Sequence, residues 1–292
     1  MKSASNPKSS LAGLKSPLMF QARLGRRTAR RLRQMLRCRR VSLQGVPVLF
    51  ANSFPKSGTH LLTQVLQGFP KIGPAVDSGL PAIVTFEGDT GRPRSEAEIL
   101  ADLQRLLPGD IAYGHVHALP QAVEFLRRPA MASYFILRDP RDVVVSHVHY
   151  VTEMEPGHIH HPYYTEVLRD FDERLSASIL GRPDPEIPFP NILERFEPYL
   201  GWLDQPEVLC LRFEDFILQR EETLGQVLDQ AVRRGFPLKM DRSQAVGVLA
   251  ASIDPQRSPT FRSGKVGGWR QQFSEAHKRL FKEVAGDLLL RL

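Results

Sequence analysis

Short, almost entirely apolar segments that alternate with amphipathic ones restrict the fold of this chain more than any other feature. The segments VPVLFA (residues 46–51) and SYFIL (133–137) contain hardly any polar residue, which is typical of strands buried on both faces. Helical patterns separate four such predicted strands, at residues 46–51, 110–116, 132–137 and 208–213. Parallel strands joined by right-handed helical crossovers produce this order. We therefore predict an α/β fold with a central parallel sheet flanked by helices on both faces.

The first 45 residues differ from the rest of the chain in charge. They hold 12 Lys and Arg and no acid, so that the remaining residues carry 27 basic side chains against 32 acids. The net charge of +7 thus belongs to an arm, and a nucleic-acid partner is not predicted for the domain. We predict a basic N-terminal extension over residues 1–45 and a single domain over residues 46–292.

The extension leaves three interpretations open. Leu24, Thr28, Leu32 and Met35 recur at helical spacing among arginines. The extension is a partly disordered, solvated arm, a helix that touches an anionic membrane, or an organelle-targeting peptide. No stretch approaches the roughly 18 apolar residues of a transmembrane helix. The two cysteines lie in unlike contexts and indicate no disulfide framework, so a cytoplasmic location is expected, with organelle targeting through the arm as the alternative.

A lysine, two hydroxyls and a glycine follow the first strand, in FPKSGTHLL (residues 54–62). Ligands of such sheets bind at the carboxyl ends of the strands, where a helix N-terminus offers unpaired N–H groups. Gly58 allows close approach of the backbone, Ser57 and Thr59 add donors, and Lys56 adds a charge. A P-loop-like anion site is predicted, although the lysine precedes the glycine and GxxxxGK[ST] is absent. A simple capped turn is the alternative.

Two further segments have the composition of anion sites. Arg138 ends the third predicted strand, and Ser146 follows about two helical turns later, a spacing that can grip a phosphate from two sides. Local ion pairs around the intervening proline are the alternative. Near the C-terminus, FRSGKVGGWRQQF (residues 261–273) combines basic residues with glycines and a tryptophan. Such a segment can fold over a nucleotide, or it is a flexible linker.

Taken together, PKSGT (55–59), RDPRDVVVS (138–146) and RSGKVGGW (262–269) resemble, in the same order, the motifs of cytosolic-type sulfotransferases. These enzymes use 3′-phosphoadenosine 5′-phosphosulfate (PAPS), and the similarity covers residues 46–274. The resemblance implies transfer of a sulfuryl group from PAPS to a hydroxyl or amine (EC 2.8.2 type). Adenosine 3′,5′-bisphosphate is then released, and no metal is implied.

The resemblance also implies roles for individual residues. The 5′-phosphosulfate would be held by Lys56, Ser57, Gly58, Thr59 and His60, and the nucleotide with its 3′-phosphate by Arg138, Ser146, Phe213, Arg262, Ser263 and Gly264. Three of these residues differ from the usual family pattern. His60 stands where threonine is frequent, Phe213 replaces a common tyrosine, and Ser263 replaces a lysine.

For catalysis, the family places a histidine after the second strand as the general base. The segment IAYGHVHALP (111–120) offers His115 and His117, and the distance from Arg138 along the chain favours His115. Lys56 would be the acid for the leaving group, and Ser146 would restrain Lys56 until the acceptor arrives.

The acceptor is less defined by the sequence. Seven of the nine histidines lie between residues 115 and 161, but their Pro-rich loop has no thiolate, and no metal is expected. The 154–164 loop either rims the acceptor pocket or is surface. We expect a small hydroxylated acceptor rather than a carbohydrate polymer, and a monomer or homodimer. A P-loop small-molecule kinase and a non-catalytic anion-binding protein are the alternatives.

Overall fold

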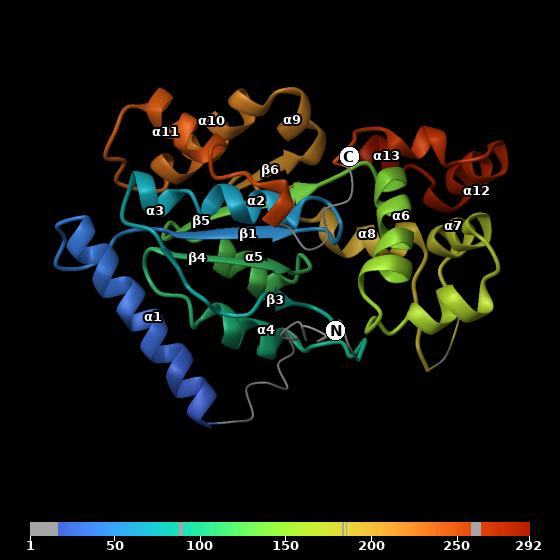
Figure 1. Cartoon of the computed structure of the whole chain (residues 1–292), viewed down its shortest axis with the longest axis horizontal. Helices are drawn as coiled ribbons and strands as arrows, with labels where there is room; N and C mark the ends of the chain where they lie inside the picture. The colour runs from blue at the N-terminus through green and yellow to red at the C-terminus, as the bar shows by residue number, and fades with distance from the viewer. Residues whose placement is uncertain (1–16, 88–89, 183, 185, 258–263) are drawn as a thin grey trace, which may run out of the picture.

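The computed structural model describes residues 17–87, 90–182, 184, 186–257 and 264–292. Its strands form one sheet in the order β2-β4-β1-β5-β6, with β3 also paired to β4, and every described pairing is parallel (Figure 1). The strands are β1 (Val48–Ser53), β2 (Val76–Asp77), β3 (Ile83–Val84), β4 (Asp110–His115), β5 (Met131–Leu137) and β6 (Val208–Arg212). The predicted α/β fold with a central parallel sheet is thus confirmed.

Side chains of successive strand residues enter two different cores. In β5, Ala132, Tyr134 and Ile136 pack on one face of the sheet, and Met131, Phe135 and Leu137 pack on the other. This explains why the predicted strands are apolar throughout rather than alternating. The very short β2 and β3 lie in a region expected to be mostly loop, because two residues are too few to show a periodicity.

Helices cover both faces of the sheet (Figure 1). The face that carries Leu49 and Tyr134 is covered by α2 (Thr59–Leu66), α3 (Phe69–Ile72), α9 (Phe213–Leu218), α10 (Arg220–Arg233) and α11 (Arg242–Ala250). The opposite face is covered by α4 (Glu96–Leu103) and α5 (Pro120–Leu126). The sequence did not indicate α11, and a short break after Leu66 separates α2 from α3.

A further group of helices lies beyond the carboxyl ends of the strands (Figure 1). It comprises α6 (Pro140–His149), α7 (Phe171–Leu180), α8 (Ile192–Leu200), α12 (Glu275–Ala285) and α13 (Leu288–Arg291). After α6 the chain widens into a π-helical turn at Tyr150–Met154, and a second π-helical turn, Tyr163–Val167, precedes α7. Gly286 separates α12 from α13.

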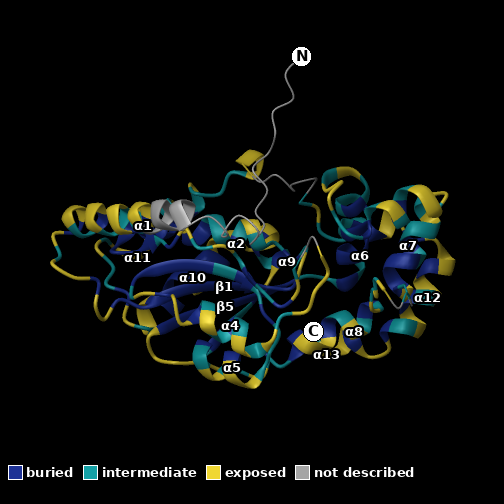
Figure 2. Cartoon of the chain, turned by 90° about the horizontal axis from the view of Figure 1, so that it is seen from below, coloured by how far each residue is buried: buried dark blue, intermediate teal, exposed yellow. Residues whose placement is uncertain are grey.

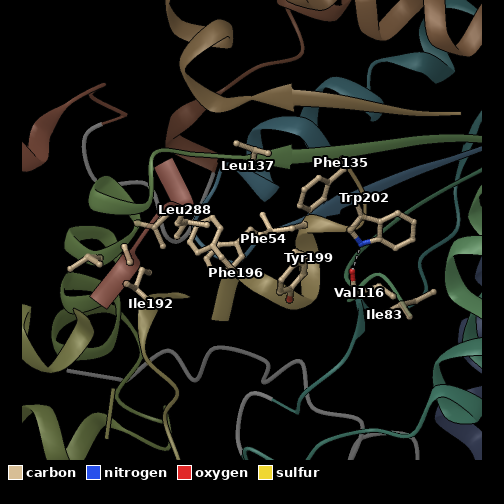
Figure 3. Close-up of a cluster of buried hydrophobic side chains, with 14 of the residues drawn as sticks. Phe54, Ile83, Val116, Phe135, Leu137, Ile192, Phe196, Tyr199, Trp202 and Leu288 are labelled. Carbon is tan, nitrogen blue, oxygen red and sulfur yellow. Dashed lines mark hydrogen bonds between the residues drawn. The ribbon is translucent and has the colours of Figure 1, made fainter. Parts of the chain in front are cut away.

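A cluster of aromatic side chains joins this group to the sheet (Figure 3). Phe54, which follows β1, stacks on Phe196 of α8 with ring centroids 3.7 Å apart. The carbonyl oxygen of Val116 accepts hydrogen bonds from the indole of Trp202 at 2.8 Å and from the amide of Asn52 at 2.9 Å. The segment that follows β4 is therefore held rigidly against the end of β1.

The helix α1 (Pro17–Arg37) packs against the amino ends of the strands, at the opposite end of the sheet. Arg27 and Arg31 both bind the carboxylate of Asp110, which is fully buried at the start of β4. The Gln34 amide donates to the carbonyls of Pro70 and Gly73, each at 2.8 Å. The interpretation of this part of the extension as a solvated arm is therefore wrong for one face of α1, because arginines four residues apart share one buried carboxylate.

Replacing Asp110 with alanine should lower the free energy of unfolding by about 3–5 kcal/mol, because it leaves Arg27 and Arg31 without their buried counter-charge. The measurement is a urea unfolding curve of the full chain. Asp229→Ala, which removes the exposed pair with Arg242, is the matched control and should cost at most about 1 kcal/mol. Equal losses in the two variants would show that the Asp110 contacts do not stabilise the fold.

Candidate anion-binding and catalytic site

The turn between β1 and α2 leaves a row of hydrogen-bond donors without partners. Lys56 and Gly58 have left-handed backbone conformations, with φ of 67° and 102°. Within the described part of the chain, the N–H groups of residues 58–61 form no hydrogen bond. The Ser57 hydroxyl is fully buried and likewise has no described partner. Convergent donors at a helix N-terminus favour an anion, and a strained lysine in the same turn is typical of a functional site.

Residue 58 must be a glycine because of its close neighbours as well as because of its backbone conformation. A Cβ atom at this position would lie 2.8 Å from Cδ2 of Phe213 and 3.2 Å from Cδ1 of Ile136. The Phe213 ring also carries the Arg138 guanidinium, whose Cζ lies 4.4 Å from the ring centroid. Phe213 therefore lies between the first and second predicted anion motifs and brings them together.

Gly58→Ala should lower the thermal stability, because both φ and the Phe213 ring oppose a methyl group. We expect a loss of about 1–3 kcal/mol in the free energy of unfolding. Gly45→Ala is the control, since Gly45 has a φ of 78° but nothing within 4 Å of its would-be Cβ. Should both variants lose the same stability, contact with Phe213 would have no part in the effect.

Lys56 is a cation in a poorly hydrated position. Its Nζ lies 3.6 Å from the centroid of the Tyr150 ring, and no described carboxylate forms an ion pair with it. Burial, followed by the charge of Arg138, lowers the pKa of Lys56 to about 7. In this environment, an anion would restore the charged form of the amine.

His115 is oriented by the end of β1. Its Nδ1 lies 2.9 Å from the carbonyl oxygen of Ser53, so Nδ1–H donates and Nε2 keeps its lone pair. The Ser53 hydroxyl lies 3.1 Å from Nδ1 and 2.8 Å from the Thr59 hydroxyl. It thus links the histidine to the turn between β1 and α2, which we call the anion turn. Burial is the main cause that lowers the pKa of His115 to about 4. The imidazole is therefore neutral at pH 7 and able to accept a proton.

His117 has a different environment. Its ring packs edge-on between Tyr199 and Phe86, with centroids 4.6 Å and 5.6 Å away. Burial lowers its pKa to about 4, and the Lys56 charge does not contribute to this shift, whereas it contributes at His115. The structure thus brings His115, and not His117, to the anion turn.

Arg138 and Asp142 connect the second motif to the C-terminal glycine-rich segment. Arg138 Nη2 donates to the Lys265 carbonyl at 2.8 Å and lies 3.4 Å from the Asp142 carboxylate. That carboxylate accepts the backbone N–H groups of Gly267 at 2.8 Å and Trp269 at 2.9 Å. The residues around Arg138 do form local ion pairs, but they also hold a segment more than 120 residues away in sequence.

Five predicted residues remain, two of which the structure does not describe. Ser146 is half-buried on α6, one turn before Tyr150, which contacts Lys56. His60 lies in the first turn of α2, where partial burial and the Lys56 charge lower its pKa. Gly264 has a left-handed φ of 60° next to Lys265. Arg262 and Ser263 lie outside the described residues.

Sequence reasoning missed three residues that shape this site: Ser53, Asp142 and Tyr150. Asp142 had a signal, since it follows Arg138 by four residues across a helix N-terminus. Ser53 ends a buried strand, and its hydrogen bonds with His115 depend on where β4 pairs. Tyr150 reaches Lys56 from a π-helical turn, which no pattern in the sequence indicates.

The histidine-rich region is a packed aromatic cluster. His147 stacks on Phe189 with ring centroids 4.8 Å apart, and Tyr164 is fully buried beside it. Burial is the main cause that lowers the pKa of His158 and of His160 to about 4. Among the residues that the structure describes, no group of three or more His, Cys, Asp or Glu is arranged to hold a metal ion. Tyr164 therefore belongs to the core and not to a pocket rim.

Comparison with known proteins shows the fold. Mouse sulfotransferase SULT7A1, solved in complex with PAP, superimposes with a TM-score of 0.56 at 18% identity, covering 82% of this chain and 83% of that chain. Retinol dehydratase in complex with androsterone and the inactive cofactor PAP has a TM-score of 0.55 at 15% identity, covering 89% of this chain and 85% of that chain. A complex of retinol dehydratase with retinol and PAP has a TM-score of 0.54 at 16% identity, covering 83% of this chain and 81% of that chain.

These structures share their fold with this chain. No family model and no curated protein sequence matches it. No helix in the described ranges is long and apolar enough to cross a membrane.

Proposed function

We propose that this protein transfers a sulfuryl group from PAPS to a hydroxyl or amine of a small-molecule acceptor. The observation that carries the proposal is the meeting of a neutral, oriented His115 with Lys56 and an unsatisfied donor turn, joined by Ser53 and Thr59. A base beside an anion cradle is what transfer of an anionic group to a hydroxyl requires.

The residues present fit the two anionic ends of PAPS. The buried Ser57 hydroxyl and the free N–H groups of residues 58–61 suit the 5′-phosphosulfate, together with Lys56, Thr59 and His60. Arg138 and Ser146 would hold the 3′-phosphate, with Phe213 packed between the two ends. The resemblance adds Arg262, Ser263 and Gly264 to this second group.

PAPS, when bound, supplies an electrophilic sulfuryl group on a phosphate leaving group. His115 would accept the acceptor's proton at Nε2, because its Nδ1 is committed to the Ser53 carbonyl. The Ser53 carbonyl would also stabilise the imidazolium that forms.

Lys56 would neutralise charge that develops on the leaving phosphate. The Lys56 ammonium lies over the ring of Tyr150, which directly follows α6 and is one helical turn from Ser146. Tyr150 and Ser146 can therefore both hold the Lys56 side chain in position. Release from this contact toward a bound anion would raise its pKa and keep it charged during transfer.

The direct test uses PAPS with a labelled sulfuryl group and pools of hydroxylated and phenolic metabolites, including apolar alcohols, since two structural neighbours were solved with androsterone or retinol. We expect label transfer without added metal. Adenosine 3′,5′-bisphosphate should raise the thermal midpoint, and AMP should raise it much less because it lacks the 3′-phosphate that Arg138 would bind. Stabilisation by ATP with Mg²⁺, but not by the bisphosphate, would favour a kinase and overturn the proposal.

A further inference from the structure

The helix α1 has a fixed rotation on the domain. Arg27 and Arg31 are held inward by the buried carboxylate of Asp110, and Gln34 is held by the carbonyls of Pro70 and Gly73. With about 100° between successive residues, the opposite side of α1 must then face away from the domain. The buried side of α1 thus carries polar side chains, whereas the buried side of a usual surface helix is apolar.

Apolar side chains occupy the outward side of α1 and the loop after it. Leu32 is 52% exposed, Leu36 is 80% exposed, and Val41 is completely exposed. Figure 2 shows this side of α1 as an exposed band along the edge of the molecule. Single exposed apolar residues are ordinary, but Leu32 and Leu36 are four residues apart on one side of α1, and Val41 follows in the loop after it.

Arginines flank these apolar residues. Arg26, Arg33 and Arg37 are exposed, and none of them forms an ion pair with a carboxylate of the described residues. The sequence contains no acid before Asp77, and three lysines lie in the first 15 residues. The surface around Leu32 and Leu36 therefore carries positive charge that no carboxylate of the described residues neutralises.

We infer that this surface, formed by Arg26, Leu32, Arg33, Leu36, Arg37 and Val41, binds the surface of an anionic lipid bilayer. Cations bind acidic headgroups while apolar side chains enter the boundary between headgroups and acyl chains, so a mixed surface suits a membrane. A nucleic acid would be matched by the arginines but not by the leucines. The surface lies at the amino ends of the strands, and the candidate site at the carboxyl ends stays accessible.

The test is co-sedimentation of the full chain with vesicles of phosphatidylcholine, with and without about 30% phosphatidylserine. Binding is expected only to the anionic vesicles and should weaken with salt. Arg33→Gln with Arg37→Gln should lower the partition coefficient about 25-fold, since each surface cation contributes roughly fivefold. Leu36→Ser should lower it about tenfold through lost apolar insertion.

Matched controls separate this surface from general stickiness. Arg279→Gln and Leu290→Ser change an exposed arginine and a leucine that is 90% exposed near the C-terminus, and both should leave vesicle binding unchanged. Thermal unfolding confirms that each variant is folded. Absence of binding to anionic vesicles overturns the inference, as does equal binding to neutral vesicles or an unchanged partition in Leu36→Ser. Retention on heparin without vesicle binding would point to a polyanion partner instead and also overturn it.

Discussion

Replacing His115 with asparagine should lower kcat for sulfuryl transfer by about 10²- to 10⁴-fold, the range for loss of a general base. Asparagine can still donate to the Ser53 carbonyl, but it offers no basic nitrogen where Nε2 stands. Affinity for adenosine 3′,5′-bisphosphate should change little, because His115 is a proton acceptor in this proposal and holds no phosphate. Single-turnover transfer and calorimetric binding measure the two quantities separately.

His117→Asn is the matched control, since His117 lies two residues away and burial likewise lowers its pKa to about 4. Its packing against Tyr199 and Phe86 gives it no contact with the anion turn, so its kcat should stay within about tenfold of the parent. A large loss in His117→Asn together with near-normal turnover in His115→Asn would reverse the assignment of the base.

Replacing Lys56 with methionine should lower kcat by at least about 10²-fold and also weaken nucleotide binding, because it removes the charge that faces the leaving group. Methionine retains much of the aliphatic packing over Tyr150, so the loss measures charge rather than shape. If Lys56→Met binds the bisphosphate about as tightly as the parent and turns over normally, Lys56 has no part in the proposed mechanism.

The pKa of Lys56 gives a second, independent measurement. Because burial and Arg138 lower this pKa to about 7, most Lys56 side chains are neutral at pH 8 in the free protein. Binding of the anionic nucleotide favours the charged amine, so binding at pH 8 should take up close to one proton, and binding at pH 6 should take up little. Calorimetry in buffers of different ionisation enthalpy reports this number.

The proton uptake should vanish in Lys56→Met, and His60→Gln should keep it, since His60 is a neighbour with a pKa below that of the lysine. In the free enzyme, kcat/KM should rise as His115 loses its proton near pH 4 and fall above about pH 7 as Lys56 becomes neutral. A profile that is flat between pH 6 and 9 would contradict the assignment of Lys56 as an acid.

The sequence by itself determined the class of fold and the place of the turn between β1 and α2. A strand such as MASYFIL is apolar on both sides only where helices cover both faces of a sheet, and this local property does not depend on the partners chosen. PKSGT at a strand end likewise places donors at the carboxyl edge, because the backbone direction alone fixes where the strand and helix meet.

Only the tertiary structure decided which side chains share the site. The sequence offers both His115 and His117 and favours His115 only by its distance from Arg138. The pairing of β4 with β1 brings His115 to Ser53 and leaves His117 among aromatic rings. Asp142 finds Gly267 and Trp269 across the fold, and Tyr150 reaches Lys56 from a π-helical turn. Arg27 and Arg31, for whose segment the sequence left three interpretations open, turn inward because Asp110 lies buried where they pack. Such contacts depend on distances between segments remote in the chain, and a local pattern of residue types carries no information on those distances.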